Sequence, residues 1–181
     1  MSLKPNIEVS ITPTGARLVA TTAISQDSIF YRIPIDHLVH QPTYQTVQTG
    51  LDVHVEDPYL SYMNHSCDPN VLIDTTTLEC RAIRPIEPLE ELRFFYPSTE
   101  WDMNRPFICQ CGSSNCLRIV AGAKYLALDA LSQQFINRHI RLQALMCLDA
   151  KAFENRITQS TRHFKSKKAD YAPLHSVESL Q

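Results

Sequence analysis

Three cysteines lie within eight residues of one another in the segment "CQCGSSNC". Cys109, Cys111 and Cys116 form a C-x-C-x4-C pattern. Clustered cysteines in a chain without a secretory signal favour thiolate ligands for zinc over a disulfide framework. A structural zinc ion takes four ligands, so three thiolates leave it one ligand short. The sequence therefore predicts a zinc site whose fourth ligand comes from another part of the chain.

The remaining candidates for that ligand are Cys67, Cys80, Cys147 and the histidines. Cys67 stands in "MNHSCDPN", a polar, turn-forming segment in which a thiolate can be presented and hydrogen-bonded. Cys80 falls at an apolar strand position and Cys147 on an apolar helical pattern, which is typical of buried structural thiols. The pattern favours Cys67.

Composition narrows the class of protein. A chain of 181 residues is long enough for one compact domain with an appendage. Its formal net charge of -2 gives no basic field of the kind that drives nucleic-acid binding. No apolar run approaches the roughly 18 residues that a membrane span needs, and the first residues show no signal-peptide pattern. We expect a cytoplasmic or nuclear protein that is not secreted, and the oligomeric state is left open.

The elements that must position these cysteines are short strands. "IEVSI", "ARLVATT" and "SIFYRIPI" alternate or are β-branched, "PNVLIDTTTLECRAI" is typical of a hairpin, and "ELRFFY" indicates a buried strand. About eight strands and no long helix are expected before residue 121. Residues 122–158 show helical periodicity, in two pieces, and residues 159–181 are predicted to be a mobile tail.

Three segments occur together in a recognisable order and spacing: "NHSCDPN", "EELRFFYPSTEW" and "PFICQCGSSNCLRIVAGAKYL". In them the chain resembles the SET domain, the fold of S-adenosylmethionine-dependent protein lysine methyltransferases, with its post-SET zinc segment. It looks closest to the compact SET proteins that carry the "FFYPSTEW" signature. The resemblance implies a mainly β fold of short strands with a knot-like threading and a C-terminal helical extension. It divides the chain into a SET domain (1–104), a post-SET zinc segment (105–121), a helical extension (122–158) and the tail (159–181).

The resemblance also implies a complete ligand set for the metal. In this family the cysteine of the asparagine-histidine-serine-cysteine motif is the fourth zinc ligand. That role falls to Cys67, which would complete a four-thiolate Zn²⁺ site with Cys109, Cys111 and Cys116.

Roles in the active site follow from the same resemblance. Tyr96 corresponds to the catalytic tyrosine, and Asn64 and His65 correspond to residues that contact S-adenosylmethionine. Phe107 resembles the aromatic residue that closes over the adenine, and Tyr96 also borders the cofactor. Phe94 stands at the position that tunes how many methyl groups are added.

Tyr62 is a weaker candidate for the substrate channel, alongside Phe94. Family members also carry a Gly-x-Gly near the N-terminus, which contacts the cofactor. The matching positions here are Gly15, Ala16 and Arg17, so the second glycine is an arginine. Either the backbone keeps an ordinary conformation there and Arg17 points outward, or the cofactor site is altered.

Two further glycines of the family are replaced. Leu89 follows Pro88 where a proline-glycine turn is more typical, and Arg118 stands where glycine is common. These changes are consistent with a diverged member of the family.

The leading interpretation is an S-adenosylmethionine-dependent methyltransferase whose partner is a lysine side chain of a protein or peptide. A free lysine amine has a pKa of about 10.4, so it must lose a proton before it can attack a methyl group. Two alternatives stay open: an enzyme acting on a small molecule in a biosynthetic pathway, and a catalytically inactive SET scaffold used for binding.

Overall fold

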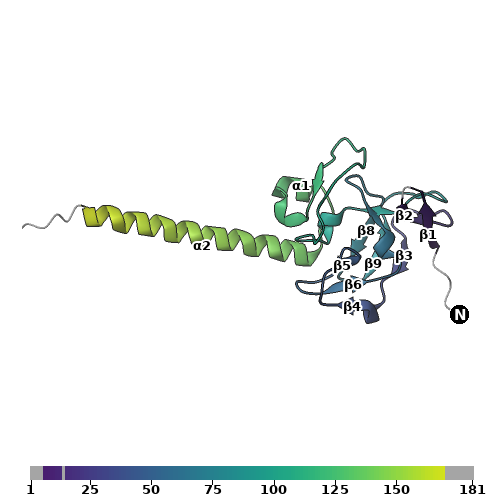
Figure 1. The fold of residues 1–181 in the computed structure, drawn as a ribbon, viewed down its shortest axis with the longest axis horizontal. Coiled ribbons are helices and arrows are strands. Elements are labelled where there is room, and N and C mark those ends of the chain that lie inside the picture. The colour runs from purple at the N-terminus through teal and green to yellow at the C-terminus, as the bar shows by residue number, and fades with distance from the viewer. Residues whose placement is uncertain (1–5, 14, 170–181) are drawn as a thin grey trace, which may run out of the picture. The chain divides into compact units, whose positions relative to one another are not determined.

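The computed structural model describes residues 6–13 and 15–169. All strands precede the two α-helices along the chain, as the colour gradient of Figure 1 shows. The mainly β fold with a C-terminal helix is therefore confirmed. The described residues form twelve strands rather than about eight, because several strands have only two residues and are too short to produce a visible alternation in sequence.

The first two predicted strands form a hairpin. Strands β1 (Ile7–Thr12) and β2 (Gly15–Ala20) pair antiparallel along their whole length. One face of β2 enters the core, where Leu18 is fully buried, whereas Ile11 on β1 is exposed. The C-terminal half of β2 is buried at consecutive residues, whereas β1 keeps exposed positions.

A five-stranded sheet forms the centre of the fold, with the order β3-β9-β8-β10-β7. Its strands are β3 (Ile29–Arg32), β9 (Glu79–Ala82), β8 (Val71–Asp74), β10 (Arg93–Phe94) and β7 (Asn64–His65). Strands β8 and β9 form the hairpin predicted from "PNVLIDTTTLECRAI". Strand β10 lies between β7 and β8, which follow each other in the chain, and pairs parallel with both.

Smaller elements surround this sheet. Strands β4 (Leu38–Val39), β6 (His54–Glu56) and β5 (Thr46–Gln48) form a three-stranded antiparallel sheet, and β11 (Phe107–Ile108) pairs with β12 (Ile119–Val120). Short 3-10 turns are η1 (Ile35–His37), η2 (Leu60–Tyr62), η3 (Tyr96–Ser98) and η4 (Ala123–Tyr125). The core that they enclose is apolar and has fully buried members from many segments: Leu18, Met63, Ile73, Ile86 and Leu92.

The chain divides into two compact units, Met1–Ala144 and Leu145–Gln181. Helix α1 spans Leu128–Ser132 and helix α2 spans Arg138–Ala169, so the periodic region does form two helices. Helix α2 continues through residues 159–169, the first part of the predicted tail, because no proline or glycine interrupts it. Residues 170–181 of that segment lie outside the described residues. In the part of the chain that is described, no helix is long and apolar enough to cross a bilayer.

The apolar pattern of α2 is not buried along its length. Ile140 is fully buried, whereas Leu145, Met146 and Phe153 are more than half exposed. Cys147 is also exposed, so the expectation that it is a buried thiol is wrong. Cys80 is buried as expected. Helical periodicity identified the helix but carried no information about what covers it.

Two of the replaced glycines occupy backbone conformations that favour glycine. Leu89 has a φ of 66° and Arg118 has a φ of 66°, in the left-handed region. Such a conformation costs a residue with a Cβ roughly 1–2 kcal/mol. Arg17 is not among the positive-φ residues and lies in β2 opposite Ser10, so its backbone is ordinary strand.

We expect Leu89→Gly to stabilise the protein. Leu89 is 72% exposed, so its side chain contributes little packing, while its backbone N–H donates to the carbonyl of Ala20 in either variant. Glycine removes the strain of the left-handed conformation, but it also gains more conformational entropy on unfolding than leucine does. The net increase in the free energy of unfolding is about 0.5–1 kcal/mol. Urea unfolding would show a higher midpoint at an unchanged slope. Leu89→Ala is the matched control, because it keeps the strained φ; an equal gain in that variant would contradict the explanation.

Candidate functional site

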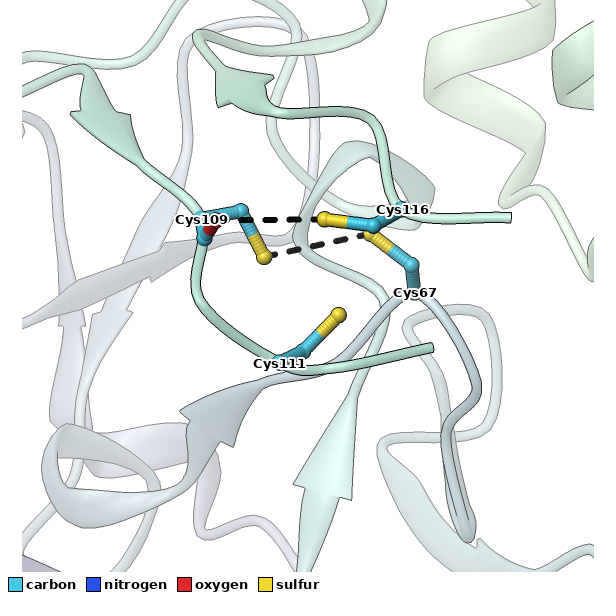
Figure 2. A group of neighbouring side chains, drawn as sticks. All are labelled: Cys67, Cys109, Cys111 and Cys116. Carbon is cyan, nitrogen blue, oxygen red and sulfur yellow. Dashed lines mark hydrogen bonds between the residues drawn. The ribbon is translucent and has the colours of Figure 1, made fainter. Parts of the chain in front are cut away.

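Four thiols from two distant segments meet at one point. The Sγ atoms of Cys67, Cys109, Cys111 and Cys116 all lie within 4.8 Å of one another, and those of Cys67 and Cys109 are 4.0 Å apart. Figure 2 shows the four side chains pointing toward a common centre. A tetrahedral zinc ion with Zn–S bonds of about 2.3 Å needs sulfur atoms about 3.8 Å apart. This donor set fits such an ion with a small contraction.

Local backbone geometry brings the three clustered thiols together. Strands β11 and β12 flank the loop, and the N–H of Cys109 donates to the carbonyl of Arg118 at 2.8 Å. Gly112 has a φ of 78°, which turns the chain tightly between the ligands. The N–H of Leu117 donates to the Sγ of Cys67 at 3.3 Å, which joins this loop to the "MNHSCDPN" segment.

The charge states of these thiols differ. Burial raises the pKa of the Cys67 thiol and of the Cys109 thiol. Burial also acts on Cys111, but hydrogen bonds from Ser113 outweigh it and lower the pKa of that thiol to about 6. A thiolate is the metal-binding form of cysteine, so one ligand is already favoured in that form at neutral pH.

His65 links the thiol cluster to Tyr96. The backbone N–H of Tyr96 donates to His65 Nδ1 at 3.2 Å, and His65 Nε2 lies 3.2 Å from the Sγ of Cys67. Since Nδ1 accepts a hydrogen bond, the ring proton is on Nε2 and is donated to the sulfur. Burial lowers the pKa of His65 to about 4, so the ring is neutral at pH 7.

A cavity of about 800 Å³ opens beside this link. Five residues predicted for the active site line it: Asn64, His65, Phe94, Tyr96 and Phe107. Cys109 and Cys111 line it as well, so the thiol cluster borders the cavity. The predicted residues come from "MNHSCDPN", from the segment around Tyr96 and from β11, and only the tertiary fold brings them to one hollow.

Tyr96 stands at the start of η3 with its ring in an aromatic cluster. Its hydroxyl donates to the carbonyl of Met63 at 3.1 Å, and its ring centroid lies 4.7 Å from that of Phe94. Burial, together with the nearby charges of Glu100 and Glu91, raises the pKa of the Tyr96 hydroxyl. The hydroxyl is therefore protonated at neutral pH, and its oxygen lone pairs are available as acceptors. Phe94 belongs to both the apolar core and the cavity wall.

Two charged residues beside Asn64 were not predicted from the sequence. The Nδ2–H₂ of Asn64 donates to Glu91 Oε1 at 2.8 Å, and Glu91 Oε2 pairs with Arg93 at 2.5 Å. Burial opposes the charge on Glu91, but the hydrogen bonds from Arg93 and Asn64 outweigh it and lower the pKa of that carboxyl. Glu91 and Arg93 both line the cavity. The alternation of charged and apolar residues in "EELRF" was the signal that could have found them.

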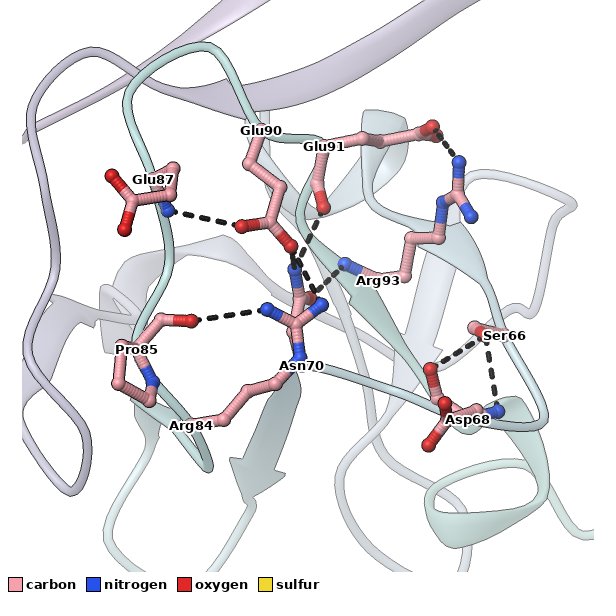
Figure 3. A network of polar contacts seen from close by, with 9 residues as sticks. All are labelled: Ser66, Asp68, Asn70, Arg84, Pro85, Glu87, Glu90, Glu91 and Arg93. Carbon is pink, nitrogen blue, oxygen red and sulfur yellow. Dashed lines mark hydrogen bonds and ion pairs between the residues drawn. The ribbon is translucent and has the colours of Figure 1, made fainter. Parts of the chain in front are cut away.

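The last residue of "MNHSCDPN" fixes the neighbouring strand. Asn70 is buried; its Nδ2–H₂ donates to the carbonyl of Glu91 and to Glu90, and its Oδ1 accepts from the N–H of Arg93 at 2.8 Å. Figure 3 shows this network converging on Asn70, with the Ser66 and Asp68 turn beside it. These contacts hold β10, and with it Phe94, next to the segment that carries Cys67.

Four predicted residues are not brought to the cavity wall. Gly15, Ala16 and Arg17 lie on β2, where the carbonyl of Ala16 accepts a long contact from Asn64 Nδ2 at 3.5 Å. The Nε of Arg17 is buried and finds no hydrogen-bond partner among the described residues. Tyr62 packs partly against the apolar core instead of lining the cavity.

Glu100 is a cavity residue that sequence reasoning also missed. Its Oε1 accepts hydrogen bonds from the N–H of Gln48 at 2.8 Å and from the Thr99 hydroxyl at 3.2 Å. Burial raises the pKa of the carboxyl to about 7 despite these contacts. Its signal in the sequence was a single acidic residue inside the otherwise uncharged "FFYPSTEW".

This pKa gives a testable dependence of stability on pH. The folded-state pKa of Glu100, about 7, lies above its ordinary value of 4.5, so the folded state binds the proton more tightly. Its contribution to stability is therefore present at low pH and is lost as the pH rises from about 4.5 to 7. We expect Glu100→Gln to match the wild type near pH 5 and to exceed it by about 1–3 kcal/mol at pH 8 in urea unfolding.

The matched control is Asp102→Asn. Asp102 pairs with Lys124, and that hydrogen bond lowers the pKa of its carboxyl, so its loss should give no gain at pH 8. A Glu100→Gln protein that gains no stability between pH 5 and 8 would contradict the burial of this charge.

Comparison with known proteins decides the family. The sequence model of the SET domain matches residues 15–97. The chain is 40% identical over 133 residues to the methyltransferase flvH of Aspergillus flavus, a match that covers 72% of this chain and 75% of that protein. This chain belongs to the SET-domain family. The SET match ends at residue 97, one residue after Tyr96, and the thiol cluster loop lies beyond it.

Solved structures are similar over about two thirds of this SET protein. The methyltransferase domain of human histone-lysine N-methyltransferase SETMAR has a TM-score of 0.49 and 18% identity, and the match covers 66% of this chain and 59% of that one. KRYPTONITE in complex with mCHG DNA and SAH has a TM-score of 0.48 and 19% identity, over 65% of this chain and 29% of that one. The chain thus spans less than two thirds of either structure.

Proposed function

We propose that this SET protein is an S-adenosylmethionine-dependent methyltransferase that acts on a lysine side chain of a protein. The observation that carries the proposal is the convergence of Asn64, His65, Phe94, Tyr96 and Phe107 on one cavity. Its volume, about 800 Å³, lies within the range of small-molecule sites. Its wall combines aromatic rings with amide and charged groups, which suits an adenine and an amino-acid moiety.

The chain's own residues would divide the work. S-adenosylmethionine, when bound, supplies a methyl group on a positively charged sulfur. The Tyr96 hydroxyl donates a hydrogen bond to the carbonyl of Met63, which leaves its oxygen lone pairs as acceptors for polarised C–H or N–H groups in the cavity that Tyr96 lines. Phe94 and Phe107 exclude water from the hollow, which strengthens such contacts. Asn64 is held in place by Glu91.

Zinc would have a structural role at the thiol cluster. Cys67, Cys109, Cys111 and Cys116 fit a closed tetrahedral shell, which leaves no open position for catalysis. Such an ion would tie the "MNHSCDPN" segment to the loop that follows β11. It would thereby hold Phe107 and His65 at the cavity wall.

Calorimetry with S-adenosylmethionine tests the proposal. We expect the zinc-loaded protein to bind about one equivalent. In a methylation assay with lysine-containing peptides, Tyr96→Phe should keep cofactor binding and lose about 100-fold in rate, because only the hydroxyl is removed. A folded, zinc-loaded protein that binds no cofactor would refute the proposal. Cofactor binding with methylation of small amines but of no peptide would instead support a small-molecule substrate.

A further inference from the structure

The cavity contains an acidic group that the proposed chemistry has not yet used. Glu100 lines the same hollow as Tyr96, and its backbone N–H donates to the carbonyl of Tyr96 at 2.9 Å. Its carboxylate is close enough to the Tyr96 phenol for its charge to raise the pKa of that hydroxyl. The two polar groups therefore belong to the wall of one cavity, and burial affects both.

The carboxylate is held in position from two sides. The N–H of Gln48 in β5 and the hydroxyl of Thr99 both donate to Oε1. Thr99 is fully buried, and its carbonyl accepts a hydrogen bond from His139 Nε2 at 2.8 Å. These contacts use Oε1. No described residue donates a hydrogen bond to Oε2, so this oxygen is available as an acceptor in a residue that lines the cavity.

The other charged groups at the cavity already have partners. Glu91 is paired with Arg93 and with Asn64, so both of its oxygens are engaged. Arg105 is the remaining cation of the wall, and it stacks over the ring of Tyr44 at 5.1 Å. Glu100 is thus the cavity carboxylate whose neighbours are hydrogen-bond donors without charge.

We infer that Glu100 binds the ammonium group of the amine substrate and accepts its proton before methyl transfer. The inference rests on the proposed function. An N–H bond of the ammonium breaks, an O–H bond forms on Glu100, and the nitrogen keeps the electron pair. That pair forms the new C–N bond as the methyl C–S bond breaks, which leaves S-adenosylhomocysteine and a methylated ammonium. The proton on Glu100 returns to solvent when the product leaves.

This assignment explains two features of Glu100 together. A carboxylate in the cavity wall with an oxygen that no described residue occupies attracts a cationic amine, and so selects amines over neutral nucleophiles. Burial places the pKa of the carboxyl at about 7, which is the range in which a proton acceptor works best at neutral pH. A purely structural acceptor for Gln48 and Thr99 would need only one oxygen and no charge.

The test uses two cofactor analogues and needs no identified substrate. Sinefungin carries a primary amine in place of the methylsulfonium group, whereas S-adenosylhomocysteine carries a neutral thioether there. Calorimetry at pH 8 would measure both dissociation constants for the zinc-loaded wild type, Glu100→Gln and Asp102→Asn. We expect the preference for sinefungin to fall about 10-fold or more in Glu100→Gln, the loss of one charge-assisted hydrogen bond, with S-adenosylhomocysteine binding unchanged. Asp102→Asn removes the same charge outside the cavity and should keep the wild-type preference.

Each outcome decides one question. If S-adenosylhomocysteine binds and the preference is the same in Glu100→Gln, Glu100 does not face the amine, and the proposed function is untouched. If S-adenosylhomocysteine does not bind the wild type, the proposed function fails and the inference fails with it. Glutamine keeps an Oε1 acceptor for Gln48, and a thermal unfolding curve would check that the variant is folded.

A pH series on the wild type gives a second measurement that needs no variant. The preference for sinefungin should fall between pH 8 and pH 6, because a protonated Glu100 no longer attracts the ammonium. Other titratable or charged groups at the cavity are Glu91, Arg93, Arg105, His65, Tyr96, Tyr44 and the cluster thiols Cys109 and Cys111, and His54 and His139 lie on the adjacent segments. Burial lowers the pKa values of all three histidines, so they start the series neutral at pH 8. A preference that stays constant over this range would overturn the inference.

Discussion

Cys67→Ser is expected to release the metal and to cost the fold more than about 3 kcal/mol. Cys67 is buried, its Sγ lies within 4.8 Å of three other thiols, and it is the only member of that cluster from outside the 109–116 loop. Serine is a poor zinc ligand, so the ion would lose a quarter of its shell and the loop would lose its tie to "MNHSCDPN". The zinc content measured after dialysis should fall from about one zinc per chain to well below half.

Cys147→Ser is the matched control for this substitution. Cys147 is exposed on α2 and lies outside the thiol cluster, so the variant should keep its zinc and its unfolding midpoint. Full zinc content in Cys67→Ser would refute the four-ligand assignment. Cys67→Ser should also weaken cofactor binding, because His65 donates its Nε2–H to the Sγ of Cys67 and accepts a hydrogen bond from the backbone N–H of Tyr96.

Asn137→Ala is expected to destabilise the protein by about 3–5 kcal/mol. Asn137 is 1% exposed, and its side chain makes hydrogen bonds to two separate segments, residues 73–75 and Ser98. Its Nδ2–H₂ donates to the carbonyls of Ile73 at 2.8 Å and Ser98 at 3.0 Å, and its Oδ1 accepts from the N–H of Thr75 at 2.9 Å. Alanine would remove the partners of the Thr75 N–H and the Ile73 carbonyl, would leave the Ser98 carbonyl with only the backbone N–H of residue 137, and would open a small void as well.

The effect should extend from stability to the cavity. Ser98 follows Tyr96 by two residues, and its carbonyl is held both by the side chain and by the backbone N–H of Asn137. Loss of this support should loosen η3 and weaken binding of S-adenosylhomocysteine in calorimetry. Asn155→Ala, an exposed position on α2, is the matched control and should change the free energy of unfolding by less than about 0.5 kcal/mol. A loss below about 1 kcal/mol in Asn137→Ala would show that the network is not holding the turn.

Local patterns in the sequence were sufficient for the elements with clear alternation. The β1–β2 and β8–β9 hairpins, the two helices after Gly122 and the meeting of Cys67 with the clustered cysteines all follow from residue types and spacing read with the family resemblance. Cysteine spacing is informative because thiolates in one short loop have few other uses. Strand alternation is informative because side chains point to opposite faces at every residue.

What the sequence could not supply was the environment of individual side chains. In the sequence, the charged residues Glu91, Arg93 and Glu100 have no distinguishing feature. Their roles depend on a cavity formed by segments tens of residues apart. The shift of the Glu100 pKa needs burial, and burial is a property of the packed fold. The exposure of Cys147 was missed for the same reason, since the apolar face of a helix gives no information about what covers it.

By itself, then, the sequence determined the family, the mainly β architecture with a C-terminal helix, and the residues that meet around the cysteine cluster. Only the tertiary structure decided that Tyr96, Glu91 and Glu100 share one cavity, that Arg17 keeps an ordinary strand backbone, and that Leu89 and Arg118 carry side chains at positive φ. The physical reason is that motifs record residue types at fixed spacing, whereas desolvation, electrostatic coupling and backbone strain arise from contacts between segments distant in the chain.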